Sequence, residues 1–500
     1  MPNYSYERSA GRKGVAPSMQ TPYRAFMDNS SESISRRDLL ANSAGGLGAI
    51  ALACLLNEEA GAQAGSERKS GTHFPPKAKR VIQIFCMGGV SHVDTFDYKP
   101  DLEKHNGESV TNKGKIDTFF GQPGTLMKSP FEFRRYGRSG KMVSSLLPHL
   151  AECVDDLTFI HSLSSKSSNH TPATFFMNSG FTMNGFPCLG AWLSYGLGSA
   201  NQNLPTFVTL PDPRGLPAGG AINWTNGFLP ATHQGVAFGN GKEPIPDLFT
   251  PAGVASKQRH AEMEFLSGLN REFLRQNPGD STLSARIRAY ELAAQMQMSI
   301  PEVIGFDAES EATKRLYGLD NSITAGFGRN CLLARRLLER GVRFVQVMHG
   351  GAFGSPRINW DGHEDVVENH TKQAAVMDKP LAGLLKDLKA RGLLDDTLIL
   401  WMTEFGRTPI TQGIGTRGRD HHPNAFTMWM AGAGLKHGVS YGASDEIGYS
   451  VAENPVEVYD YHATALNLLG LDHKRLTYYH NGIQRRLTDV HGHVIESILA

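Results

Sequence analysis

The chain has 500 residues, 50 Lys and Arg against 49 Asp and Glu, and a formal net charge of +1 at pH 7. Because this charge is near zero and the basic residues are scattered, neither nucleic acid nor an anionic membrane is expected as the main partner. The five cysteines include no C-x-x-C pair, so they predict no zinc ribbon and no redox motif. The length allows one large domain with insertions, or two domains.

The first segment, residues 1–62, has the pattern of a twin-arginine export signal. Arg36 and Arg37 precede an apolar run over residues 39–56 that is diluted by Ala and Gly. This run is too weakly hydrophobic for a stable membrane span, whereas paired arginines before such a run are a translocation address. We therefore expect export to the periplasm or cell surface, with no stable membrane span after signal processing.

The processing of this signal has two possible routes. Residues 60–62, Ala-Gly-Ala, form a small-residue cleavage motif, and Cys54 is an alternative site of lipid attachment. Met27 is an alternative start to Met1. Residues 63–79 are polar, basic and Pro-containing, which predicts a linker into the folded part.

From residue 80 to residue 500, short apolar runs alternate with helical patterns. Helical stripes are expected over 332–338 and 381–388, and a closing helix over 461–469. Buried strands are expected at residues 81–86, 343–348, 397–402 and 426–430. This alternation predicts an α/β domain with a mostly parallel sheet and helices on both faces.

Residues 200–320 interrupt this alternation. Pro-rich loops come first, and a polar helical stretch follows over residues 256–298. We interpret the segment as a large insertion or cap that decorates the sheet without extending its centre.

Acidic and imidazole side chains follow three of the predicted strands. The first strand is followed by GGVSHVDTFDYKP, the second by HGGAFGSPRINWDGHED, and the third by TEFGRTP and then GRDHHP. Ligands of open α/β sheets bind beyond the carboxyl ends of the strands, and imidazoles and carboxylates are common ligands of divalent cations. The predicted ligands of such an ion, which could be zinc, calcium, manganese or magnesium, are Asp361, His363, Glu404, His421, His422, His92, Asp94 and Asp97.

Two arginines lie beside these residues. Arg407 and Arg419 are expected to hold an anionic ester group bidentately. The competing interpretation is a set of separate salt bridges along the rim of the sheet, such as a Glu404–Arg407 ion pair.

Several motifs resemble an exported protein family known as domain of unknown function 1501. They are GGVSHVDTFDYKP, WDGHEDVVENHTK, DDTLILWMTEFGRTP, GRDHHPNAFTMWMAGAG and the closing RRLTDVHGHVIESILA, and the resemblance spans nearly all of residues 80–500. That family is similar to the sulfatase and alkaline phosphatase superfamily. The resemblance therefore implies a doubly wound α/β fold with a metal-centred hydrolase site.

The chain departs from the sulfatase pattern at the nucleophile. The sulfatase motif C-x-P-x-R corresponds here to residues 170–174, His-Thr-Pro-Ala-Thr, which contain neither Cys nor Arg, so formylglycine chemistry is not expected. We expect His170 and Thr171 to point into the same cleft as Glu404, with the Thr171 hydroxyl as nucleophile and His170 as ligand or base. The alternative is that Asn169 and His170 only cap a helix.

Two functions follow from these patterns. The first is an exported metal-dependent hydrolase of a sulfate, phosphate or related ester, acting on a small-molecule or polysaccharide substrate without formylglycine. The alternative is a non-catalytic carbohydrate- or surface-binding relative that has lost its metal site. A stoichiometric divalent ion in the purified protein supports the first, and its absence supports the second.

Overall fold

The computed structural model describes residues 71–500 apart from 111–117, 120, 202, 240–255, 355 and most of 278–302. The predicted export signal, with Arg36, Arg37, Cys54 and Met27, and residues 63–70 of the predicted linker lie outside these residues. Among the described residues, no helix is both long enough and apolar enough to cross a bilayer.

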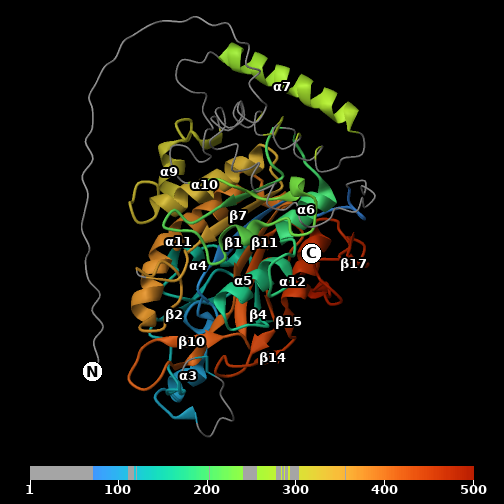
Figure 1. Ribbon diagram of the computed structural model, residues 1–500. Helices are drawn as coiled ribbons and strands as arrows, with labels where there is room; N and C mark the ends of the chain where they lie inside the picture. The colour runs from blue at the N-terminus through green and yellow to red at the C-terminus, as the bar shows by residue number, and fades with distance from the viewer. Residues whose placement is uncertain are drawn as a thin grey trace, which may run out of the picture. The chain divides into compact units, whose positions relative to one another are not determined.

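A nine-stranded sheet runs through this part of the chain (Figure 1). Its order is β12-β4-β11-β8-β1-β7-β5-β6, with β15 beside β4. The strand bounds are β1 Arg80–Cys86, β4 Leu157–Ser164, β5 Phe207–Leu210, β6 Val236–Ala237, β7 Phe344–His349, β8 Thr397–Thr403, β11 Phe426–Gly432, β12 Ser440–Tyr441 and β15 Val456–Glu457. All four predicted strands belong to this sheet, as β1, β7, β8 and β11.

The directions of the strands confirm a mostly parallel α/β sheet. Strand β1 is parallel to both of its neighbours, β7 and β8. Strand β5 continues the parallel set beyond β7. Strand β11 is antiparallel to both β8 and β4.

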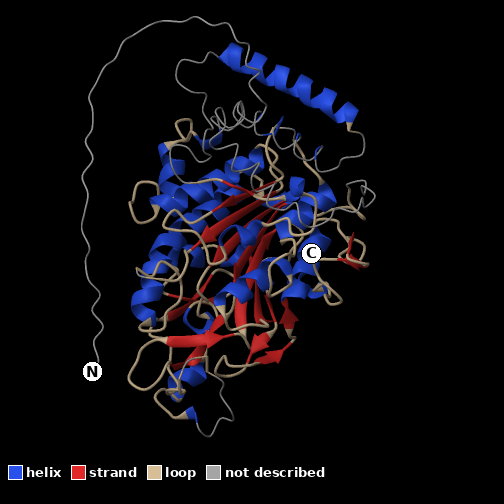
Figure 2. Cartoon of the chain, in the orientation of Figure 1, coloured by secondary structure: helices blue, strands red, loops and turns tan. Residues whose placement is uncertain are grey.

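Helices cover both faces of the sheet, as predicted (Figure 2). Alternate side chains of β1 point to opposite faces, so Ile82 and Ile84 pack with one group of helices and Val81 and Phe85 with the other. The helices of the first face are α4 Pro148–Ala151, α10 Ala325–Glu339 and α11 Val366–Ala390; those of the second are α5 His170–Ser179, α6 Leu189–Leu197 and α12 Val458–Leu468. The leucine stripes of α10 and α11 are therefore the buried faces that the sequence predicts.

The segment expected as an insertion contributes to the edge of the sheet. Strands β5 and β6 both lie within residues 200–320 and pair with each other. Helix α7, Ser256–Gln276, covers the first part of the expected polar helical stretch, and most of the remainder lies outside the described residues.

Neighbouring strand ends bring the site residues to one edge of the sheet. Strand β8 leads into Glu404, and the loop after β7 carries Asp361 and His363. A hairpin of β9 Gly406–Thr411 and β10 Arg419–His422 follows β8. The turn that follows β1 requires glycine at position 88. Gly88 has φ 108°, and a Cβ atom there would lie 2.4 Å from the backbone nitrogen of Trp360.

Two buried histidines predict acid sensitivity of the fold. The Trp360 indole donates to His349 Nδ1 at 2.9 Å, and the Ser91 amide donates to His370 Nε2 at 3.1 Å. Both rings must be neutral to accept these bonds, and burial lowers the pKa of each to about 3.

We expect the protein to lose stability between pH 7 and pH 5. In the unfolded chain each ring takes up a proton below about pH 6.5, whereas the folded protein resists protonation until about pH 3. The stabilisation is thus complete above pH 6.5 and falls with pH, by about 1–2 kcal/mol for each ring between pH 7 and pH 5. Denaturant unfolding at the two pH values measures the loss, and equal stability at both would contradict it.

Candidate metal centre

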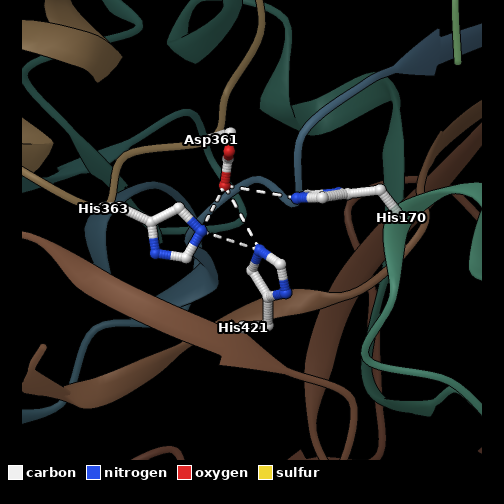
Figure 3. Close-up of side chains that lie close together, drawn as sticks. All are labelled: His170, Asp361, His363 and His421. Atoms are coloured by element: carbon white, nitrogen blue, oxygen red, sulfur yellow. Dashed lines mark hydrogen bonds and ion pairs between the residues drawn. The ribbon is translucent and has the colours of Figure 1, made fainter. Parts of the chain in front are cut away.

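Four side chains, His170, Asp361, His363 and His421, converge on one point. One nitrogen or oxygen atom from each lies within 4.8 Å of those of the others. Asp361 Oδ1 is 2.8 Å from His363 Nε2, 3.2 Å from His170 Nε2 and 3.3 Å from His421 Nε2 (Figure 3). We call these four residues the metal cluster.

The members of the metal cluster come from separate parts of the chain. His170 is the first residue of α5, and His421 lies on β10. Asp361 and His363 lie in the loop between β7 and α11. The fold, rather than one local motif, therefore assembles the cluster.

The second nitrogen of every imidazole in the cluster has an oxygen acceptor. His170 Nδ1 lies 2.6 Å from Glu404 Oε1, and His421 Nδ1 lies 2.7 Å from the carbonyl oxygen of Ser168. His363 Nδ1 contacts the side-chain oxygen of Gln412. A carbonyl or a carboxylate oxygen can only accept, so the neutral form of each ring satisfies this contact with its proton on Nδ1. Each Nε2 is then left with a bare lone pair directed at Asp361, which is the arrangement of metal-binding histidines.

The charge state of the cluster also suits a cation. Burial lowers the pKa of His421 to about 3, so this ring is neutral at physiological pH. Burial opposes ionisation of Asp361, but the neighbouring Arg407 guanidinium overcomes it and holds the pKa of this carboxyl well below its usual range. Three lone pairs and a carboxylate oxygen facing one another repel unless a cation lies between them.

The spacing of these atoms fits a small divalent ion. Ligands at about 2.0–2.1 Å around a tetrahedral ion are about 3.3 Å apart. The distances of 2.8, 3.2 and 3.3 Å from Asp361 Oδ1 to the three Nε2 atoms are close to this value. His170, Asp361, His363 and His421 would therefore hold the ion.

Glu404 supports the cluster from outside it. This buried carboxylate accepts from the Gly88 amide at 2.8 Å and from His170 Nδ1 at 2.6 Å through the same oxygen, Oε1. The structure thus brings Glu404 next to the predicted site, as the partner of a ligand.

Glu404→Ala should weaken binding of a divalent ion roughly 10- to 100-fold, as loss of a group that orients a metal-binding histidine does. Glu404→Gln keeps an acceptor and should have a smaller effect. Competition with a chromophoric chelator measures both affinities. Unchanged affinity in the alanine variant would show that Glu404 does not hold His170 for an ion.

The structure places four predicted ligands away from the cluster. His92 Nε2 contacts the Gly448 carbonyl at 2.8 Å, and His422 Nε2 contacts the Tyr449 carbonyl at 2.6 Å. Asp97 pairs with Lys99, and Asp94 pairs with Arg419. The positive φ angles of Gly88 and Gly89 turn the chain directly after β1, and the residues that follow contact Gly448, Arg419 and Lys99 instead of the cluster.

Both predicted anion-binding arginines already donate hydrogen bonds to oxygen atoms of the protein. Arg407 donates to Asp361 Oδ1 at 2.6 Å and to the carbonyl of Gly89 at 2.9 Å. Arg419 forms a bidentate pair with Asp94, at 2.7 and 3.1 Å, and also donates to the Thr408 carbonyl. Both arginine side chains are fully buried, so an incoming ester has no access to them here.

The cavity beside the cluster contains residues that the sequence did not single out. Its volume is about 290 Å³, and the lining residues are Phe119, Asn169, His170, Phe353, Arg357, Asp361, His363 and His421. Arg357 donates to Asp361 Oδ2 at 2.9 Å and to Glu364 at 2.9 Å.

Thr171 is half-buried at the second position of α5 and is not among the residues that line the cavity. Asn169 makes no side-chain cap of α5.

Comparison with known proteins finds one matching family model and several similar solved structures. No curated protein matches the chain in sequence. A sulfatase from Pseudoalteromonas sp. is 12% identical, with 91% of this chain and 76% of that one covered at a TM-score of 0.35. A phosphonate monoester hydrolase from Silicibacter pomeroyi is 13% identical, with 71% of each chain covered at a TM-score of 0.33. The TAB5 alkaline phosphatase is 11% identical, with 73% of this chain and 94% of that one covered at a TM-score of 0.31.

One family model covers most of the molecule. Residues 78–499 match the model described as protein of unknown function DUF1501. The matched residues include the whole metal cluster and every strand of the main sheet. The chain therefore belongs to the DUF1501 family.

Proposed function

We propose that this protein is a metal-dependent hydrolase of a sulfate, phosphate or related ester, with one divalent ion held by the metal cluster. One observation carries the proposal. The Nε2 atoms of His170, His363 and His421 face one carboxylate oxygen of Asp361, and the Nδ1 atom of each ring meets an oxygen acceptor, as in metal-binding histidines. A chain that had lost its metal site would have no reason to keep this arrangement.

The residues around the cluster can each take a separate role in ester hydrolysis. A bound divalent ion supplies Lewis acidity toward an ester oxygen and toward water. Glu404 holds the His170 ring by its Nδ1 proton, and Arg407 compensates the charge of Asp361. Arg357, partly exposed at the cavity, is placed to neutralise an anionic ester.

The proposed hydrolysis does not use formylglycine as the nucleophile. His170, a member of the metal cluster, stands where the sulfatase pattern has its cysteine. The attacking group is then water or the Thr171 hydroxyl, and Thr171→Ala separates the two. Retained turnover in that variant indicates water, whereas loss of turnover with the ion still bound indicates Thr171.

The direct test is activity of the purified, metal-loaded chain. Zinc, manganese, calcium and magnesium are each supplied, and aryl sulfate, phosphomonoester and phosphodiester substrates are compared. We expect hydrolysis of at least one class, lost in His363→Ala and retained in His105→Ala, a control at a histidine outside the cluster. A bound ion without hydrolysis of any class contradicts the hydrolase. A protein that takes up no ion favours the non-catalytic carbohydrate- or surface-binding alternative.

We further propose export through the twin-arginine pathway to the periplasm or cell surface. The support is the pair Arg36 and Arg37 before the apolar run. Replacing both with Lys should leave the protein in the cytoplasm, as cell fractionation would measure. A matched Arg134→Lys, Arg135→Lys variant, changed within the folded part, should be exported normally. Normal export of the Arg36, Arg37 variant would contradict the proposal.

A further inference from the structure

Two phenylalanine rings stand at the cavity beside the metal cluster. Phe353 stacks on His170 with ring centroids 4.0 Å apart, and Phe119 lies against His421 at 4.7 Å. Both rings line the cavity, yet 37% of Phe353 and 41% of Phe119 is exposed. Apolar rings that line a small cavity are typical of a ligand site, in which apolar walls surround a few convergent polar groups.

Arg357 is the cation of the same cavity. One of its nitrogens holds Asp361 Oδ2 at 2.9 Å, and another holds Glu364 at 2.9 Å. The Glu364 side chain is 73% exposed, so solvent screens this second pair and it contributes little. An anionic group in the cavity can therefore replace Glu364 at the guanidinium, whose fork suits sulfate and phosphate oxygens.

The size of the cavity limits what can enter. Its volume of about 290 Å³ is at the lower end of the range for small-molecule sites. That space suits one anionic group and one ring, and the phenylalanines offer no hydrogen bonds to a polar chain. The ligand must then present an apolar ring face beside its charge.

We propose that the cavity selects an anionic ester borne on a single ring with apolar faces, an aryl or a pyranose ring. Phe119 and Phe353 contact the ring, and Arg357 contacts the anion. The inference rests on the proposed function for the bound ion, but ring selection requires no hydrolysis and can be measured as binding.

Calorimetry on the metal-loaded full chain compares phenylphosphonate with methylphosphonate, which carries the same anion without a ring. Each aromatic contact should favour the phenyl compound roughly 2- to 12-fold. The Phe119→Ala, Phe353→Ala double variant should bind phenylphosphonate no better than methylphosphonate, with its metal content unchanged. Phe265→Ala, an exposed phenylalanine outside the cavity, should leave both affinities unchanged.

Arg357→Ala should weaken both phosphonates alike, roughly 10- to 100-fold, because both carry the anion. Arg417→Ala is the matched control, since Arg417 pairs with an acid, Asp365, but does not line this cavity. Equal binding of the phenyl and methyl compounds by the unmodified protein would overturn the proposal. Loss of methylphosphonate binding in the phenylalanine variant would also overturn it, because the rings would then only support the histidines.

Two further comparisons distinguish aryl from pyranose selectivity, and distinguish failure of the ring-site proposal from failure of the hydrolase proposal. If the phenylalanine variant weakens phenylphosphonate but not glucose 6-phosphate, the site selects aryl rings; if it weakens both, it also accepts pyranose rings. Ring-selective binding without hydrolysis of any ester contradicts the hydrolase and supports the ring site. Hydrolysis of phenyl phosphate and glycerol phosphate with equal kcat/KM supports the hydrolase and contradicts the ring site.

Discussion

Asp361→Ala should remove the bound ion and lower the free energy of unfolding by about 3–5 kcal/mol, the usual cost of leaving one partner of a buried ion pair alone. Asp361 Oδ1 is the atom that all three imidazoles of the cluster approach, so its loss removes the negative charge at their centre. The same oxygen accepts from the fully buried Arg407 at 2.6 Å. The variant would therefore lose an ion ligand and leave a buried guanidinium without its carboxylate.

The control for this result is Asp365→Ala. Asp365 lies in the same loop and also pairs with an arginine, but its partner Arg417 is 71% exposed and neither residue belongs to the cluster. Its side chain accepts from the amides of Val367 and Glu368 at the start of α11, so this variant should lose about 1 kcal/mol for the missing helix cap. Metal content and denaturant unfolding distinguish the two variants. Retention of a full equivalent of ion by Asp361→Ala would contradict its role as a ligand.

Asp94→Ala should destabilise the protein by about 3–5 kcal/mol while the metal content stays the same, because the lost partner is again a buried arginine. Asp94 and Arg419 are both fully buried and joined by two bonds of 2.7 and 3.1 Å. Arg419 and Ser91 hold the pKa of Asp94 below its usual value even though burial opposes this. The pair thus fixes the β1 loop against β10 rather than binding an ion.

The comparison between Asp94 and Asp361 is informative because the sequence predicts both as metal ligands. Denaturant unfolding and metal analysis of Asp94→Ala decide between the two roles. A chain that unfolds more readily and still holds its ion fits the structural role. A variant that is as stable as the unmodified chain but has lost its ion would show that Asp94 is a ligand.

The strand pattern was sufficient to predict the central sheet, because fully buried strands form continuous apolar runs. Strands β1, β7, β8 and β11 all lie in such runs. The direction of β11 was not predictable, since its apolar run reads the same in either orientation. Strand β4, Leu157–Ser164, was missed although it is also largely buried.

The strand-end rule predicted the edge of the sheet at which the candidate cluster lies, but it could not select the members of that cluster. It brought Asp361, His363 and His421 together with Glu404, because loops after neighbouring parallel strands meet at one edge. It could not show that the turn at Gly88 directs Asp94 to Arg419 instead. Side-chain direction after a glycine turn depends on tertiary contacts that no spacing in the sequence encodes.

The residues that line the cavity carried the weakest signals in the sequence. Phe119 and Phe353 lie in loops without periodicity, and Arg357 is one basic residue among many. One signal was available for Arg357, since it stands four residues before Asp361 and pairs with it. The carbonyl of Ser168, which holds His421, could not be found in this way because every residue has a carbonyl.

The metal content of the purified chain tests the central claim most directly. Elemental analysis of the unmodified protein should find one divalent ion per chain, and the His363→Ala, His421→Ala double variant should contain none while remaining folded. An unmodified chain that binds no ion from any of the four metals, or a double variant that keeps its full equivalent, would contradict a metal centre at His170, Asp361, His363 and His421.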